Sequence, residues 1–294
     1  MHVLVAGLLN METSVPVGEF PVAYRTTRFV DGIRSTVSGV GWNVGLALDT
    51  LGAPVRLLGF AGDDPPGDLV RRAVAERGIE ATLVRSPRTP ESVILYDRQG
   101  RRAIFGDLAG VPDLEMPDDA LAAASAGCGV AVLANVNWTR RLLAPVRERG
   151  IRIVTDLHDV DSLDHPYDRD YLEHADVVFL SHERLGAAPE EVAAEIHRRH
   201  ATPVVVVGLG GDGALLSRPG TPPIRVPAAV PRPIVATTGA GDALLAAFVH
   251  FAIVRRRDDE AALRAAVAFA GWKIGAAGGS EGFVDEAAVD RLTQ

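Results

Sequence analysis

Short apolar runs alternate with longer amphipathic stretches along most of this chain. The runs are rich in β-branched residues and continuous, as at 204–207, which is typical of strands buried on both faces of a parallel sheet. The sequence predicts strands at 2–9, 55–60, 79–84, 130–134, 151–155, 177–180 and 204–207, and helices at 43–51, 68–77, 139–149 and 190–199. This alternation predicts an α/β fold with a mostly parallel sheet covered by helices on both faces.

Two stretches break the alternation. Residues 21–37 have extended character, and 91–97 with 101–107 predict a hairpin around Arg98, Gln99 and Gly100. Because no helices separate these strands, we expect a small antiparallel sheet, a discontinuous lid formed by about 12–37 and 90–108 within a single domain spanning 1–294. Such a lid would cover the carboxyl ends of the parallel strands, where open α/β sheets bind ligands. Its exposed edge could pair with a second copy, giving a homodimer through the lid.

A glycine-rich turn precedes the most apolar helical stretch, residues 243–254. The amides of Gly239, Ala240 and Gly241 are expected to point outward at the positive end of this helix and to form an anion site. Asp242 would lie at the mouth of that site, where a carboxylate can take the proton of a hydroxyl group that attacks a phosphoryl group. An acidic residue in a first helical turn is also common for purely structural reasons, so this stretch alone leaves both roles open.

Two further motifs are weaker when taken alone. Gly39, Gly41 and Asn43 could let the backbone approach a polyol, although a tight turn and a helix cap explain them equally well. The run at 208–213 matches the dinucleotide pattern G-x-G-x-x-G, but no helix pattern follows it, so we interpret it as a loop that lines a nucleotide. The acidic, histidine-containing run at 156–165 lacks metal-site spacing and is interpreted as a solvated loop, in which Asp156, at a strand end, is the one position of functional interest.

Composition narrows the choice of partners and compartment. The chain has 294 residues, 47% of them hydrophobic, with a net charge of −8, which disfavours nucleic acid or an anionic membrane as a partner. One cysteine excludes a disulfide framework. The first residues lack a basic leader and read as a strand, and no apolar run is long enough to span a membrane, so we expect a cytoplasmic protein.

Taken together and in order, these motifs resemble the ribokinase-like (PfkB-type) carbohydrate kinase family over essentially the whole chain. Residues 237–242 are similar to its C-terminal signature, and 38–43 followed by 59–67 to its N-terminal one. The resemblance implies a three-layer sandwich with a mostly parallel central sheet and a small β-sheet lid, and ATP with Mg²⁺ as cofactors. For catalysis it implies Asp242 as base and Gly239, Ala240 and Gly241 as the anion hole. It implies sugar contacts at Asn10, Glu12, Gly39, Gly41, Asn43 and Asn135, and nucleotide contacts at Thr237, Thr238, Leu209, Gly210 and Gly213.

The chain departs from the family pattern at three positions. Ala236 replaces an Asp that the family associates with a monovalent-cation site; the loss of this carboxylate disfavours potassium activation but leaves the question open. Glu183 lies one residue away from a Glu that the family places near magnesium, and it is the candidate metal-associated residue. Gly208 stands where the family often has Thr. None of these changes removes the base or the anion hole.

The sequence therefore predicts an ATP-dependent kinase that phosphorylates a hydroxymethyl group of a sugar or sugar-like compound. A nucleoside kinase is the alternative within the same fold, because Tyr24, Phe29, Trp42 or Phe105 could stack on a base. We favour the interpretation that these aromatic residues form the lid core. A ligand-sensing protein that lost phosphoryl transfer is the alternative from another class, and the retained Asp242 argues against it.

Overall fold

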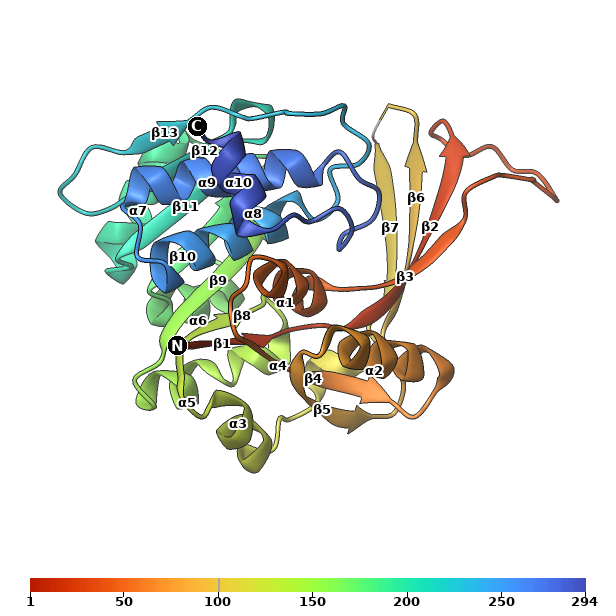
Figure 1. Ribbon diagram of the computed structural model, residues 1–294, viewed down its shortest axis with the longest axis horizontal. Helices are drawn as coiled ribbons and strands as arrows, with labels where there is room; N and C mark the ends of the chain where they lie inside the picture. The colour runs from red at the N-terminus through yellow and green to blue at the C-terminus, as the bar shows by residue number, and fades with distance from the viewer. Residues whose placement is uncertain (100) are drawn as a thin grey trace.

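The computed structural model describes residues 1–99 and 101–294 and has two β-sheets, a large one inside the helical body and a small one beside it (Figure 1). The large sheet has the strand order β13-β12-β11-β10-β9-β8-β1-β4-β5. It is parallel from β11 to β5, and β12 and β13 extend it in the antiparallel sense. Its strands are β1 (His2–Ala6), β4 (Val55–Gly62), β5 (Glu80–Ser86), β8 (Cys128–Leu133), β9 (Arg152–Asp159), β10 (Val177–Ser181), β11 (Val204–Gly208), β12 (Ala214–Ser217) and β13 (Ile224–Val226).

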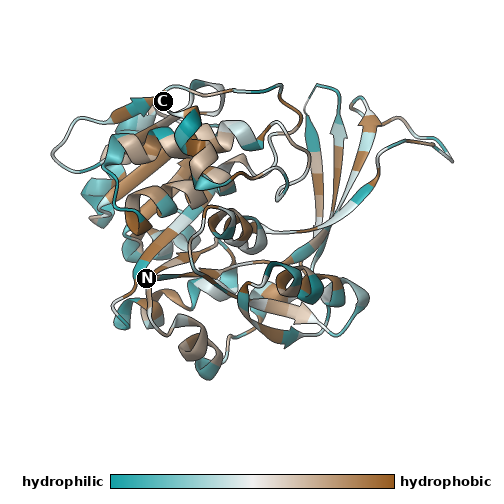
Figure 2. Cartoon of the chain, viewed as in Figure 1, coloured by the Kyte–Doolittle hydropathy of each residue, from teal (hydrophilic) through white to brown (hydrophobic). Residues whose placement is uncertain are grey.

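Helices cover both faces of this sheet, which confirms the three-layer α/β prediction. One face carries α1 (Val40–Thr50), α2 (Pro65–Arg77), α8 (Ala240–Phe248), α9 (Asp259–Lys273) and α10 (Glu286–Leu292). The other carries α3 (Asp118–Ser125), α4 (Asn137–Arg140), α5 (Leu143–Glu148), α6 (Pro166–His174) and α7 (Pro189–His200). Strand β1 contributes side chains to the hydrophobic cores on both faces of the sheet. Val3 and Val5 pack on the first face, and Leu4 and Ala6 pack on the second. Figure 2 shows the resulting apolar strands enclosed by helices with polar outer surfaces.

The small sheet has the order β3-β2-β6-β7, formed by β3 (Arg34–Ser38), β2 (Asn10–Gly18), β6 (Glu91–Asp97) and β7 (Arg102–Asp107). Its outer pairs are antiparallel, but the central β2 and β6 are parallel, so the expectation of a wholly antiparallel sheet was wrong. The reason is topological: β2 follows β1 and β6 follows β5, and both leave the large sheet at the same edge. The predicted hairpin is present, with Gly100 outside the described residues.

Three local predictions were also wrong. Residues 21–33 are not a strand; the strand lies earlier, at β2, and only 34–38 pairs with it. The predicted helix at 139–149 is broken into α4 and α5, because Pro145 has no N–H and its ring clashes with the carbonyl of Arg141. The predicted helix at 243–254 is α-helical only to Phe248 and then continues as the π-helix Val249–Val254.

The order of strands in the large sheet indicates the edge at which a ligand would bind. Strand β1 lies between β8 and β4, so the chain order reverses at β1, and open α/β sheets bind ligands outside the carboxyl ends of strands at such a point. The chain leaves β1 there and enters β2 at Asn10. Among the described residues, no helix is both long and apolar enough to cross a membrane.

Candidate active site

The N-terminus of α8 reaches this edge of the sheet through a tight glycine turn. Gly239 caps the helix in the left-handed conformation, with φ of 76°. A Cβ atom at this position would lie 2.3 Å from the carbonyl oxygen of Gly279, so both the backbone angle and the space favour glycine. Three residues later Asp242 is buried, with 9% of its surface exposed. The turn therefore places a buried carboxylate behind an accessible helix N-terminus.

The three amides expected to bind an anion are not equivalent. The N–H of Ala240 donates a hydrogen bond to the carbonyl of Thr237, with an N–O distance of 3.1 Å. Within the described part of the chain, the amides of Gly239 and Gly241 have no protein acceptor, and Gly241 is exposed. Two free amides and the positive end of the helix are thus available to an anion.

Asp242 is held by a side chain from another helix. The Nδ2 atom of Asn43, on α1, donates a hydrogen bond of 2.8 Å to Oδ2 of Asp242. Burial raises the pKa of Asp242 above the ordinary value of an aspartate, while the Asn43 hydrogen bond and the charges of His158 and Lys273 partly offset that rise. A carboxylate with a raised pKa is a stronger proton acceptor, which suits a general base.

A chain of polar contacts extends from this pair to the small sheet. Ser38 Oγ donates a hydrogen bond of 2.8 Å to Oε2 of Glu12, and it lies 3.4 Å from Oδ1 of Asn43. Glu12, on β2, is 5% exposed and Asn43 is equally buried. The structure therefore brings two of the predicted sugar-binding residues, Glu12 and Asn43, into one cluster with Asp242.

The glycines of the N-terminal motif have packing roles. Gly39 has φ of 96°, and a Cβ atom there would lie 2.5 Å from the carbonyl oxygen of Leu8. A Cβ atom at Gly41 would lie 2.8 Å from the backbone of Gly7. These glycines let the first turn of α1 pack directly on the end of β1, and so position Asn43.

Two other predicted sugar-binding residues have their hydrogen-bond partners outside this cluster. Asn10 donates a hydrogen bond of 2.9 Å from Nδ2 to Oγ of Ser92 on β6, so it joins strands of the small sheet. Asn135 lies 3.4 Å from Asp168 on α6, and its buried Oδ1 has no partner among the described residues. No hydrogen bond connects either side chain to Asp242 within the described residues.

Sequence reasoning assigned the acidic run to a loop, but its first four residues belong to β9. Asp156 is buried and its Oδ2 would lie 3.6 Å from a Cβ atom on Gly241. His158 Nδ1 lies 3.4 Å from the same Oδ2. The negative charge of Asp156 raises the pKa of His158 to about 9. Burial favours the neutral form of Asp156, but the charge and hydrogen bonds of His158 outweigh burial and hold the pKa of Asp156 below its ordinary value. The Asp-x-His spacing at a strand end was the signal for this pair.

Sequence reasoning also missed Lys273. This side chain is completely buried at the end of α9, and its Nζ donates hydrogen bonds to the carbonyl oxygens of Thr238 and Gly278. Burial lowers its pKa to about 8, although the carboxylates of Asp242 and Glu12 favour the charged form. A lone lysine in an apolar helix was the available signal.

The predicted nucleotide loops lie next to one another after β10 and β11. Ser181 pairs with Gly208, and the N–H of His182 donates to the Gly208 carbonyl at 3.0 Å. Gly213 closes the second loop with φ of 97°, and its carbonyl accepts a hydrogen bond of 2.8 Å from the N–H of Leu209. The Leu209 side chain is buried, whereas Glu183 is exposed.

The small sheet contacts the glycine turn directly. Arg102, on β7, lies with Nη1 3.4 Å from Oγ1 of Thr237. Arg34, on β3, forms an ion pair of 3.3 Å with Glu281, and Ser280 Oγ donates a hydrogen bond of 3.0 Å to the carbonyl of Val37. These contacts join the small sheet to the turn that precedes α8 and to the loop that follows α9.

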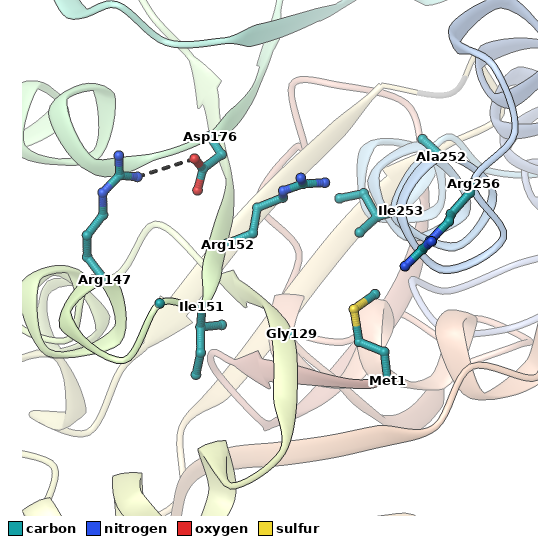
Figure 3. A pocket seen from close by; sticks show the side chains of 10 residues that line it. Met1, Gly129, Arg147, Ile151, Arg152, Asp176, Ala252, Ile253 and Arg256 are labelled. Carbon is teal, nitrogen blue, oxygen red and sulfur yellow. Dashed lines mark hydrogen bonds and ion pairs between the residues drawn. The ribbon is translucent and has the colours of Figure 1, made fainter.

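A cavity of about 590 Å³ lies elsewhere, at the amino ends of the parallel strands. Figure 3 shows Arg152 and Arg256 projecting into it and Arg147 paired with Asp176 on its wall. None of the predicted site residues lines this cavity. The described residues also contain no cluster of three or more His, Cys, Asp or Glu side chains that could hold a metal ion by themselves.

Comparison with known proteins matches residues 2–286 to the family described as pfkB family carbohydrate kinase. The acarbose 7(IV)-phosphotransferase of Actinoplanes is 30% identical over 254 residues, covering 84% of this chain and 83% of the relative. The solved structure of a microbiome-derived acarbose kinase is 28% identical with a TM-score of 0.91, covering 99% and 98%. The structure of Arabidopsis thaliana ribokinase with ribose and ATP, 22% identical, has a TM-score of 0.80 and covers 99% and 98%.

Proposed function

This chain belongs to the pfkB family of carbohydrate kinases, and we propose that it transfers the γ-phosphate of ATP to a hydroxymethyl group of a sugar or sugar-like compound. One observation carries the proposal: Asp242, bonded to Asn43, lies behind an accessible helix N-terminus and shares a buried polar cluster with Glu12. A base, an anion site and acceptors for hydroxyl groups thus converge on one edge of the sheet.

In the proposed reaction, Asp242 takes the proton of the attacking hydroxyl while the free amides of Gly239 and Gly241 stabilise charge on the transferred phosphoryl group. The Ala240 amide supports the turn through its bond to Thr237. The Glu12 carboxylate orients the acceptor by accepting hydrogen bonds from its other hydroxyl groups. The Asn43 amide exchanges hydrogen bonds with the same hydroxyl groups. The helix dipole adds positive potential at the point where negative charge accumulates.

The nucleotide would lie over the loops that follow β10 and β11, in contact with Gly210, Gly213 and the backbone of Leu209, with its phosphates directed to Thr237 and Thr238. The described residues offer no cluster of three possible metal ligands, but Mg²⁺ commonly binds one carboxylate together with water and substrate phosphates, so a single carboxylate of this chain would be enough to hold it. Exposed Glu183 is the carboxylate we assign to that role. The ion would neutralise charge on the ATP phosphates.

We assign the small sheet the role of a lid on a single domain spanning 1–294, formed by about 12–37 and 90–108. Arg102 already reaches Thr237 from β7, so its guanidinium can follow the transferred phosphate as the lid closes. Closure would exclude water that otherwise hydrolyses ATP.

The aromatic residues considered for stacking on a base do not form a lid core. Tyr24, Phe29 and Phe105 are 92%, 95% and 61% exposed, whereas Trp42 is buried at 4%. Tyr24 and Phe29 face solvent because, within the described residues, the segment between β2 and β3 pairs with no strand, and Phe105 lies on β7, an edge strand of the small sheet. Since the cluster around Asp242 is made of Glu12, Ser38 and Asn43, it favours a polyhydroxyl acceptor over a nucleobase. The exposed aromatics instead support a homodimer through the lid.

The test is ADP release from ATP and Mg²⁺ across pentoses, hexoses, nucleosides and acarbose, with mass-spectrometric location of the new phosphate. We expect phosphorylation of a sugar-like acceptor at a hydroxymethyl group, and Asp242→Asn should lower kcat by about 10²- to 10⁴-fold with little change in ATP binding. Asp118→Asn, on the exposed start of α3, is the matched control. Near-normal turnover by Asp242→Asn would refute the base, and binding without ADP release across the panel would favour a ligand sensor.

A further inference from the structure

Lys273 is the only lysine among the 30 lysine and arginine residues of this chain. Every other basic side chain is an arginine, yet this one is fully buried beside the proposed catalytic cluster. The reaction assigned to Asp242 and the glycine turn gives it no direct part. A buried ammonium is costly to retain, so its surroundings indicate what it does.

The ammonium lies between two backbone carbonyls from separate segments. Thr238 immediately precedes the helix cap Gly239, and Gly278 belongs to the loop that follows α9. The next residue of that loop, Gly279, packs its carbonyl where a side chain on Gly239 would lie. Lys273 therefore joins the two segments that define the shape of the glycine turn.

A compact cation suits this position better than the side chain used elsewhere in the chain. An ammonium is a point charge with three donors, whereas guanidinium is a wide planar fork. Arg232 lies just outside, with Nε donating 2.7 Å to the carbonyl of Trp272 and its guanidinium stacked on the Trp272 ring. The negative charges of Asp242, Glu12 and Glu281 favour the charged form of the ammonium, although its direct partners are the two carbonyls.

We propose that the Lys273 ammonium is a built-in monovalent cation of this active site, which holds the glycine turn in its anion-binding shape and makes the enzyme independent of potassium. This inference rests on the proposed kinase function. It assigns Lys273 as a positioning residue that acts through the carbonyls of Thr238 and Gly278. Ala236 supplies no carboxylate near the turn. This fits the proposal, because the Lys273 ammonium is attached to the chain and needs no such carboxylate to bind it.

The experiment compares wild type, Lys273→Ala and Lys273→Met in sodium, potassium, ammonium and methylammonium chloride at equal ionic strength. Wild type should be equally active in all four salts. Lys273→Ala should lose about tenfold or more of kcat in sodium, equivalent to at least about 1.4 kcal/mol, and recover part of it in ammonium or potassium. Lys273→Met, which fills the space, should lose activity without recovery, and Asp242→Asn should not respond to any cation.

Several outcomes overturn the inference: potassium activation of wild type, full activity of Lys273→Ala in sodium, or a loss that no cation relieves. If Lys273→Ala is too unstable to assay, its melting temperature should rise in ammonium or potassium relative to sodium, and an equal melting temperature in the three salts counts against the inference. If wild type phosphorylates no acceptor, the kinase proposal fails, and the cation-dependent melting temperature still decides the role of Lys273.

Discussion

The Nδ2 atom of Asn43 donates a hydrogen bond of 2.8 Å to Oδ2 of Asp242, which joins residues separated by 199 positions in the sequence. Asn43 lies in the first turn of α1 and Asp242 in the first turn of α8, so the contact holds two helix N-termini together at the carboxyl edge of the sheet. Because Asn43 donates to the carboxylate, it favours the ionised form that a base requires.

Replacing Asn43 with a residue that has no hydrogen-bond donor should shift the acidic limb of the plot of kcat against pH. Burial raises the pKa of Asp242 and the Asn43 hydrogen bond lowers it, so Asn43→Leu should raise the pKa further. The pH below which kcat falls should therefore be higher in the variant than in wild type. Steady-state kinetics at saturating substrate, measured from acidic to neutral pH, give this limb. Gln99→Leu is the control, since Gln99 is an exposed amide in the turn after β6 and its loss should leave the limb unmoved.

Adding a methyl group at the helix cap should damage the anion site more than it unfolds the protein. Gly239→Ala combines a left-handed φ of 76° with a 2.3 Å approach to the Gly279 carbonyl. Gly220→Ala is a matched control, with φ of 75° and nothing within 4 Å of the added Cβ.

Both variants should lose about 1 kcal/mol of stability from backbone strain, measured by urea unfolding. Gly239→Ala should in addition lose stability from the steric clash and most of its kcat. Equal kcat values in the two variants would contradict the proposed role of the turn.

Because of the Asp156–His158 pair, the free energy of unfolding should decrease as the pH becomes alkaline. The folded-state pKa of His158 is raised from 6.5 to about 9, so the contribution of the pair is complete below pH 6.5 and is lost as pH rises through about 9. The His158 side chain is 46% exposed, and solvent screening limits the contribution to about 1 kcal/mol or less. His158→Asn should be less stable than wild type in urea at pH 6 and equally stable at pH 10; an unchanged difference at both pH values would argue against an ion pair.

Arg102 should matter for turnover more than its exposed position indicates. It lies 3.4 Å from Thr237, beside the predicted phosphate position, so Arg102→Ala should lower kcat by about tenfold or more if it contacts the transferred group. Arg25→Ala removes an equivalent exposed charge in the segment between β2 and β3 and serves as the control. Equal kcat values in the two variants would remove Arg102 from the mechanism.

The exposed apolar surface of the lid should support self-association. Ile104 and Phe105 on β7 are 57% and 61% exposed, and a charge at either would be costly in an apolar interface. We expect wild type to sediment as a dimer and Phe105→Glu to shift toward monomer in analytical ultracentrifugation. Leu69→Glu, on α2 and 43% exposed, is the control for surface charge, and a monomeric wild type would rule out the lid dimer.

The sequence by itself determined the architecture and the chemistry expected of it. Periodicity located the parallel strands because fully buried strands need continuous apolar runs. Gly239 located the start of α8 because a left-handed cap favours glycine whatever surrounds it. Family resemblance, confirmed by comparison, then gave the class of reaction. Errors arose where partners decide the structure, as in β2 and β9, whose polar residues are buried only against distant strands.

Only the tertiary structure decided which side chains meet. Neither Asn43 nor Lys273 has a neighbour in sequence that indicates Asp242. Asn43 contacts Asp242, and Lys273 lies close enough for the two charges to influence each other, because α1, α8 and α9 pack on the same face of the sheet. Local residue patterns specify elements, whereas charges, pKa values and free donors depend on contacts between elements far apart in the chain.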